Sequence, residues 1–198
     1  MRVLAFVDTH GSFEHLDNLK AKAKREKVDI VLCCGDITNF GIQQKRLMES
    51  IAGFEMPVLM IHGNHEDETS LLEDCKPYEN IIFIHKAVHK VEGFCFLGYG
   101  GGGFATEDEK FLQFTKDALK EISKDDRIIL LLHGPPHGTA VDFTMGSYVG
   151  NTDYTSFIEN ANVILAVCGH IHETAGREDR INAARIINPG PSGMIIDL

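Results

Sequence analysis

Long apolar runs are missing from this sequence of 198 residues. No segment approaches the roughly 20 consecutive apolar residues that a bilayer-spanning helix needs. The apolar opening at residues 3–7 ends at Asp8 and His10, so it is too short and too polar for a secretory signal. We therefore expect a cytoplasmic protein with no membrane partner.

Cysteines are few, and their number, five, is odd, which argues against a disulfide framework. Four of them lie inside apolar runs, where free cysteine packs as a small hydrophobic side chain. No thiol stands within the polar motifs described below, which weakens the case for a structural zinc site.

Positive charge is also scarce, with 19 Lys and Arg against 29 Asp and Glu, and the net charge is −10. A basic patch is the usual electrostatic footprint of a protein that binds nucleic acid. We therefore do not expect long duplex nucleic acid as a partner. A small phosphate ester or a nucleotide remains open as a substrate, and the sequence does not indicate an oligomeric state.

The order of apolar patterns predicts an α/β fold in a single domain over residues 1–198, with no repeat or linker. In the first half, buried strands alternate with amphipathic helices, which implies parallel strands. The strands are expected at 2–7, 29–34 and 57–61 and the helices at 13–23, 42–51 and 67–75. Short strands at 81–84, 87–91 and 94–97 are expected to form hairpins, and a run of glycines at 100–103 a flexible connection. A helix at 111–122, buried strands at 127–132 and 163–168, and short strands around a turn at 188–191 complete the pattern.

Polar side chains follow the buried strands at regular intervals. Asp8 and His10 follow the first strand, Asp36 the second, and Asn64 and His65 the third. The spacing is 28 residues from Asp8 to Asp36 and again from Asp36 to Asn64, close to the length of a strand–helix–strand unit. Such residues line up along the carboxyl edge of the sheet, where open α/β sheets place their ligands. Three more candidates follow later buried strands: His133, His170 and His172.

Carboxylate and imidazole groups in this number point to a site for two divalent metal ions. Two such ions close together need a bridging anion, and a carboxylate supplies one. Mixed imidazole and carboxylate ligands suit manganese, our first expectation, or iron, zinc or nickel, better than magnesium or calcium. Glycines next to these residues are expected to let the backbone turn sharply: Gly35, Gly63 and Gly169.

The sequence resembles the calcineurin-like metallophosphoesterase family at five segments that occur in the family's order. They are Asp8-Thr9-His10, Gly35-Asp36, Gly63-Asn64-His65-Glu66, His133, and Gly169-His170-Ile171-His172. The resemblance implies a four-layer αββα sandwich of two mixed sheets flanked by helices. It is greatest to the compact bacterial and archaeal-type phosphodiesterases, which include the class III cyclic-nucleotide branch.

The resemblance also implies a role for each residue. The first metal would be bound by Asp8, His10, Asp36 and His172. The second would share Asp36 as a bridge and take Asn64, His133 and His170. A hydroxide that bridges the two metals would attack the phosphate in line, and His65 would act as the general acid that protonates the leaving oxygen. The implied activity is hydrolysis of a phosphodiester, with a phosphomonoester as a second substrate class to test.

Two positions depart from one branch of this family. In its protein serine/threonine phosphatases, the bridging Asp is followed by an Asp that pairs with the catalytic His and then by an Arg that grips phosphate. Asn39 and Phe40 occupy those positions here. The amide of Asn39 can orient His65 but cannot stabilise its protonated form as a carboxylate would. Protein-phosphatase activity is therefore not expected.

Other histidines are given ordinary structural roles. His62 is expected to pack beside the site, and surface positions are expected for His15, His85 and His89. His137 follows two prolines and is expected in a turn, and residues 139–153 show no period and could cap the site. Whether either contacts a substrate is left open.

A function of a different class is a metal-binding scaffold for protein–protein interaction without catalysis. The resembled family includes a retromer subunit of this kind, which lacks the catalytic His. This sequence retains His65 together with every expected ligand, which favours catalysis.

Overall fold

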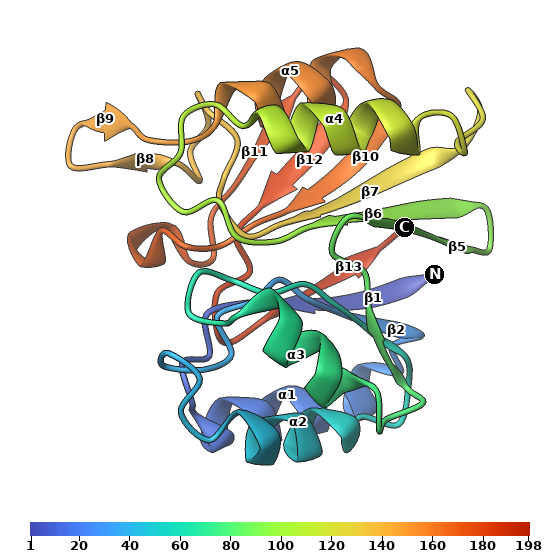
Figure 1. The fold of residues 1–198 in the computed structure, drawn as a ribbon, viewed down its shortest axis with the longest axis vertical. Coiled ribbons are helices and arrows are strands. Elements are labelled where there is room, and N and C mark those ends of the chain that lie inside the picture. The colour runs from blue at the N-terminus through green and yellow to red at the C-terminus, as the bar shows by residue number, and fades with distance from the viewer.

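Two sheets lie face to face in the computed structural model, which describes residues 1–198, and helices cover the outer face of each sheet (Figure 1). This arrangement confirms the expected αββα sandwich. Both chain termini lie at one end of the sheets, and the loops that follow the parallel strands gather at the other end. None of the helices combines the length and the apolar character needed to cross a bilayer.

The first sheet contains five strands, of which four are parallel neighbours. The order is β13 (Met194–Asp197), β1 (Arg2–Phe6), β2 (Ile30–Cys33), β3 (Val58–Met60) and β4 (Ile81–Phe83). β13 is antiparallel to β1. The outer face is covered by α1 (Phe13–Glu26), α2 (Gln44–Ala52) and α3 (Glu68–Cys75).

The sequence of α1 shows why a helix forms after the first strand. The Ser12 side chain accepts a hydrogen bond from the His15 N–H and so caps the first turn. The buried side chains recur at helical spacing: Leu16, Leu19 and Ala23. They pack with outward-facing side chains of β1 to β4 in one apolar cluster.

The second sheet contains six strands. The order is β11 (Glu178–Ile181), β12 (Ala184–Ile187), β10 (Val163–Val167), β7 (Arg127–Leu132), β6 (Phe94–Tyr99) and β5 (Ala87–Val91). Its outer face is covered by α4 (Glu109–Ala118) and α5 (Thr152–Asn160), while β8 (Phe143–Thr144) and β9 (Ser147–Tyr148) form a separate hairpin. A short 3-10 helix, η1 (His172–Thr174), follows β10.

The central strands are buried on both faces, which explains their continuous apolar runs. On β1, Leu4 and Phe6 contact the helical layer, while Val3 and Ala5 face the second sheet. Cys33 and its neighbour Cys34 divide between the two clusters in the same way. The cluster that contains Val3 and Ala5 joins side chains of both sheets and holds the two layers together.

Three features differ from the expected pattern. β4 pairs parallel with β3, so the segment 81–84 belongs to a crossover unit, and only β5 and β6 form the expected hairpin. α5 was not predicted, because its apolar side chains span only nine residues after an aperiodic loop. The helix begins at Asn151, whose side chain accepts from the Asp153 and Tyr154 N–H groups. β11 and the β8–β9 hairpin were also missed.

Candidate metal centre

The expected metal-binding residues meet at the carboxyl ends of the strands. β1, β2 and β3 are adjacent and parallel, as the 28-residue spacing predicts. Phe6, Cys33 and Met60 pair side by side at the ends of these strands. Asp8 follows its strand end by two residues, Asp36 by three and Asn64 by four. His133 follows β7 and His170 follows β10, so the second sheet contributes from the facing side.

Backbone hydrogen bonds fix these loops against one another. The His10 N–H donates to the Asp36 carbonyl (3.0 Å), and the Gly169 N–H donates to the His133 carbonyl (2.8 Å). The His170 N–H donates to Asp8 Oδ2 (3.0 Å), which joins the two sheets at the site. The loops therefore do not depend on side-chain packing alone for their positions.

Four of the candidate ligands have left-handed backbone conformations. Their φ angles are positive: 58° at Asp8, 43° at His10, 50° at Asp36 and 67° at His170. Such conformations are uncommon outside glycine, and they cluster at functional sites because surrounding structure must hold them. The backbone strain here coincides with the residues that the sequence singles out.

The candidate side chains form three overlapping groups with ligand atoms within 4.8 Å of one another. One contains Asp8, His10 and His172, another His10, Asp36 and His65, and the third Asp36, His133 and His170. Asp36 Oδ2 lies 3.3 Å from His133 Nε2, and 3.9 Å from the Nε2 atoms of both His10 and His65. Asp36 is therefore at the centre of the site, as a bridging carboxylate would have to be.

Backbone carbonyls fix which nitrogen of two imidazoles faces the site. His10 Nδ1 contacts the Thr38 carbonyl (3.2 Å), and His133 Nδ1 contacts the Cys34 carbonyl (3.0 Å). A carbonyl only accepts, so a neutral ring carries its proton on Nδ1 and points the Nε2 lone pair into the site. Metal-binding histidines are typically held by this kind of outer hydrogen bond.

Ligand atoms of facing side chains lie close together across the site. His133 Nε2 lies 3.0 Å from Asn64 Oδ1, and His10 Nε2 lies 3.0 Å from His172 Nε2. Two acceptors this close repel each other unless a proton or a cation lies near both. The structure thus brings Asn64 and His172 to the same centre as the other candidates.

The charge state of the metal-free site also suits a cation. Burial raises the pKa of Asp8 to about 6 and lowers the pKa of His170 to about 4. Burial acts to raise the pKa of Asp36 as well, but the hydrogen bond and charge of His133 outweigh it and hold that pKa at about 2. Asp8 Oδ1 and His170 Nε2 are buried without a hydrogen-bond partner. A divalent cation would supply the missing partner and charge, so the residues present fit metal ions.

His65 differs from the other imidazoles of the site. Its backbone N–H donates to Asp36 Oδ1 (2.9 Å), but its Nδ1 is buried without a partner. The ring of Phe40 stacks on it, with 4.0 Å between centroids and 21° between planes. No carbonyl anchors His65 as carbonyls anchor His10 and His133.

Asn39 makes a different contact from the one expected. Its amide nitrogen donates to the His10 carbonyl (3.0 Å), and no hydrogen bond joins it to His65. The turn after Asp36 directs this side chain toward the β1 loop. The structure therefore gives Asn39 a place beside His10, and Phe40 is the residue of this turn that contacts His65.

Glu66 had no predicted role of its own, yet it connects the loops of the site. Its buried carboxylate accepts hydrogen bonds from the N–H groups of Asp36 (2.9 Å), Thr38 (2.8 Å) and Gly63 (2.9 Å), and from Thr38 Oγ1 (2.8 Å). These bonds tie the loop after β2 to the loop after β3. Its position directly after His65 was the only signal in the sequence.

Of the three glycines beside the ligands, one turns sharply and two allow close approach. Gly35 has a φ of +90°, which fits the expected turn. Gly63 and Gly169 have no positive φ, so the expectation of a sharp turn is wrong for them. A Cβ at Gly63 would collide with Asp36 Oδ1, and one at Gly169 would collide with Val7 Cγ2.

Gly63→Ala is expected to destabilise the protein by about 3 kcal/mol, because the new methyl group overpacks the site and displaces Asp36. Thermal unfolding should then occur roughly 10 °C lower. Gly93→Ala is the control, since its φ of +80° adds strain but its Cβ meets nothing within 4 Å. The control should cost about 1–2 kcal/mol. Equal melting temperatures for the two variants would contradict the close approach.

A further group of potential ligands, formed by His62, Glu68 and His85, lies behind the Gly63 loop. The Gly100 N–H donates to His85 Nδ1 (2.7 Å), so the proton of the neutral ring is on Nε2, which then has no lone pair for a metal. The side chain of His85 is 3% exposed, so the expected surface position is wrong. It is buried because β4 joins the first sheet. His62 packs beside the site, as expected.

The segment 139–153 folds partly into the β8–β9 hairpin, which lines a cavity beside His170 and His172, and His137 contacts this segment. His137 Nδ1 lies 3.7 Å from Asp142 Oδ2, and its ring packs against Tyr148. This agrees with the expected turn role.

Comparison with known proteins identifies a family and its fold. Residues 1–174 match the model of the calcineurin-like phosphoesterases. An uncharacterized protein of Methanocaldococcus jannaschii is 28% identical over 207 residues, which covers 99% of this chain and 91% of that protein. A probable glycerophosphodiester phosphodiesterase of Arcobacter nitrofigilis is 24% identical over 177 residues, 81% of this chain and 61% of that protein. A crystal structure from Thermus thermophilus has the same fold, with a TM-score of 0.79 at 18% identity over 96% of this chain and 90% of that one.

Proposed function

The chain belongs to the calcineurin-like phosphoesterase family, and from this premise we propose that it is a phosphodiesterase that uses two divalent metal ions. The observation that carries the proposal is the position of Asp36. It belongs to two groups of candidate ligands, one with His10 and His65 and one with His133 and His170. A carboxylate shared by two groups of imidazoles is the arrangement that a pair of metal ions needs.

We assign the ligands in two sets. Asp8, His10, Asp36 and His172 would hold one ion, and Asp36, Asn64, His133 and His170 the other. When bound, the ions would lower the pKa of a water molecule and offset the negative charge of the phosphate. The protein would contribute the fixed positions of these side chains, which the carbonyls of Thr38 and Cys34 help to orient.

His65 is the proposed proton donor to the leaving oxygen. Its Nε2 is 3.9 Å from Asp36 Oδ2, which places the ring beside the proposed metal site. Phe40 covers one face of the ring, so water reaches it mainly from the other side. A proton on Nε2 would then be available to an alkoxide that leaves the phosphate.

A diester is the proposed substrate, because the position of the phosphate-gripping Arg is occupied by Phe40. A monoester carries one more negative charge than a diester and gains more from a guanidinium clamp. The similarity to the probable phosphodiesterase of Arcobacter nitrofigilis supports the same choice. Manganese is the proposed native metal, with iron, zinc or nickel as alternatives.

The first test is metal reconstitution. Metal-depleted protein is assayed on bis-p-nitrophenyl phosphate and on p-nitrophenyl phosphate, with manganese, iron, zinc, nickel or magnesium restored one at a time. Two bound ions per chain and metal-dependent turnover of the diester are expected, with slower turnover of the monoester. A protein that binds two ions but hydrolyses neither ester would favour the scaffold function.

His65→Ala is expected to reduce turnover of diesters with alkyl leaving groups roughly hundredfold to ten-thousandfold, which is the usual effect of losing a general acid. Turnover of bis-p-nitrophenyl phosphate should fall much less, because p-nitrophenolate leaves without a proton. The measurement is kcat for a matched pair of diesters that differ only in the leaving group.

Metal content and the control variant decide how this result is interpreted. His65→Ala should retain both ions, and His15→Ala, at a partly exposed histidine of α1, should change neither rate. An equal loss for both leaving groups, or loss of an ion, would remove His65 from the proton-donor role.

A further inference from the structure

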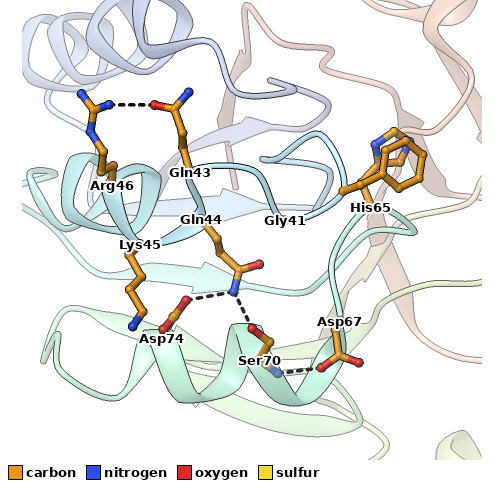
Figure 2. Close-up of a pocket in the computed structure, with 10 residues that line it drawn as sticks. Gly41, Gln43, Gln44, Lys45, Arg46, His65, Asp67, Ser70 and Asp74 are labelled. Atoms are coloured by element: carbon orange, nitrogen blue, oxygen red, sulfur yellow. Dashed lines mark hydrogen bonds between the residues drawn. The ribbon is translucent and has the colours of Figure 1, made fainter.

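Two cavities adjoin the candidate metal centre, and they share no lining residue. The first has a volume of about 490 Å³ and lies between the starts of α2 and α3, with His65 at one end (Figure 2). The second has a volume of about 350 Å³ and lies against the β8–β9 hairpin and η1, with His170 and His172 in its wall. The His10 ring lies between them, with its centroid 4.8 Å from those of both His65 and His172. A phosphate bound at the metal centre would have one cavity on each side.

The first cavity is polar. Phe40 is the single hydrophobic residue among the ten that line it, and Lys45 lies at the end away from His65 (Figure 2). The Gln44 amide nitrogen donates to Ser70 Oγ (3.0 Å) and to Asp74 Oδ2 (2.9 Å), whereas its Oε1 accepts no hydrogen bond within the chain. The cavity therefore presents acceptors and two cations, Lys45 and Arg46, which suit an alcohol with several hydroxyl groups.

Four of the nine residues that line the second cavity are hydrophobic, against one of ten in the first, and Glu173 is the one carboxylate in the second. Its hydrophobic residues are Phe104, Met145, Val149 and Ile171, and neither Lys nor Arg lines it. Phe104 is 65% exposed and Met145 is 96% exposed, although both side chains are large and apolar. Phe104 packs edge to face against His170, with 4.4 Å between ring centroids. An apolar group of a ligand would bury both side chains.

We propose that this enzyme cleaves asymmetric phosphodiesters, with a polar, hydroxylated alcohol in the first cavity and an apolar group in the second. The inference rests on the proposed function, and it adds the identity and direction of the two ester groups. Because His65 protonates the leaving oxygen and lines the first cavity, the polar alcohol is the one that leaves.

The reaction follows from this placement. The oxygen of water forms a bond to phosphorus, and the bond from phosphorus to the polar alcohol's oxygen breaks. That oxygen takes a proton from His65, which regains one from the attacking water through solvent. The products are the free polar alcohol and a phosphomonoester of the apolar group.

Glyceryl benzyl phosphate tests this direction, because its two alcohols are of similar acidity and leaving-group acidity therefore favours neither. We expect benzyl phosphate and glycerol to exceed glycerol phosphate and benzyl alcohol by at least about tenfold, the discrimination typical of one apolar pocket. Phosphorus NMR distinguishes the two phosphomonoesters in one sample.

The double variant Phe104→Ala/Met145→Ala should bring the product ratio close to one. A ratio is independent of any general loss of activity, so the variant is informative even if total turnover falls. Leu112→Ala/Leu119→Ala removes two exposed leucines of the α4 region, outside both cavities, and should leave the ratio unchanged.

The outcomes separate this inference from the proposed function. An excess of glycerol phosphate, equal amounts of the two monoesters, or an unchanged ratio in the Phe104/Met145 variant would overturn the two-cavity assignment. Turnover of bis-p-nitrophenyl phosphate would still support the phosphodiesterase in each of those cases. Failure to hydrolyse any diester with two metals bound would overturn the proposed function and the inference with it.

Discussion

Asp36→Asn is expected to lower phosphodiester turnover roughly thousandfold, which corresponds to a loss of about 4 kcal/mol of transition-state stabilisation. The variant should also fail to retain two metal ions. Metal content measured by plasma mass spectrometry and kcat/KM on bis-p-nitrophenyl phosphate check the two parts separately.

The physical reason is the central position of Asp36. Its Oδ2 lies within 3.9 Å of Nε2 atoms on three histidines, and no other carboxylate is shared between the two proposed ligand sets. Asparagine keeps the shape of the side chain and an oxygen that accepts from the His65 N–H. It removes the charge that offsets two cations, so the loss should appear in metal binding and in catalysis together.

Thermal unfolding gives a readout that does not depend on activity. A ligand at 100 times its Kd stabilises a folded protein by about 2.7 kcal/mol, so added manganese should raise the melting temperature of the wild type. Asp36→Asn should lose most of that increase. Asp17→Asn, which removes an exposed carboxylate from α1, is the matched control and should keep it. A variant at Asp36 that binds two ions with unchanged turnover would show that this residue is not the bridge.

The candidate metal centre was largely predictable because its residues follow buried strands at a regular interval. Parallel strands must end at one edge, so the placement of Asp8, Asp36 and Asn64 follows from the strand pattern. His133 and His170 could also be placed after buried strands, but only the family resemblance assigned those strands to a second sheet. The sequence could not show that the two sheets face each other, because that contact joins residues far apart in the chain.

Features that depend on the exact course of the backbone could not be predicted. The direction of the Asn39 side chain is set by the turn after Asp36, and burial of His85 is set by the pairing of β4 with β3. The first cavity is lined by residues between 40 and 74 and the second by residues between 104 and 173, so each depends on how loops separated in the chain lie against one another. Residue types alone did not distinguish Phe104 and Met145 from ordinary surface positions.

Glu66 is the clearest case of a role that exists only in three dimensions, and it leads to the second large effect. Glu66 is 7% exposed, and its carboxylate accepts four hydrogen bonds, from donors of Asp36, Thr38 and Gly63. A carboxylate satisfies all four donors at once, because each of its oxygens accepts two of them. These bonds hold the backbone at Asp36, where φ is positive, so the proposed bridging ligand depends on a residue that touches no metal.

Glu66→Gln is expected to destabilise the protein by about 3 kcal/mol. The substitution replaces one carboxylate oxygen, which accepts hydrogen bonds, by an NH₂ group, which faces the same donors and cannot accept from them. The NH₂ group should take the position of Oε1, because the Thr38 hydroxyl that donates to this oxygen can rotate and accept instead. The Thr38 N–H, which also donates to Oε1, is then left without a partner. Unfolding should occur roughly 10 °C lower. Metal affinity should fall about tenfold to hundredfold, as is usual when a residue that orients a ligand is lost.

Glu68→Gln separates this effect from a simple change of charge. Glu68 is two residues further on, and its side chain is half-exposed, with the carboxylate 3.4 Å from His85 Nε2 and 3.5 Å from Lys86 Nζ. The same substitution at this half-exposed position should shift the free energy of unfolding by less than about 0.5 kcal/mol. Calorimetric unfolding and manganese titration of both metal-free variants provide the comparison. If Glu66→Gln unfolds and binds manganese as Glu68→Gln does, the loops after β2 and β3 do not depend on Glu66. If its affinity for manganese falls while its fold persists, a side chain outside the ligand set positions Asp36.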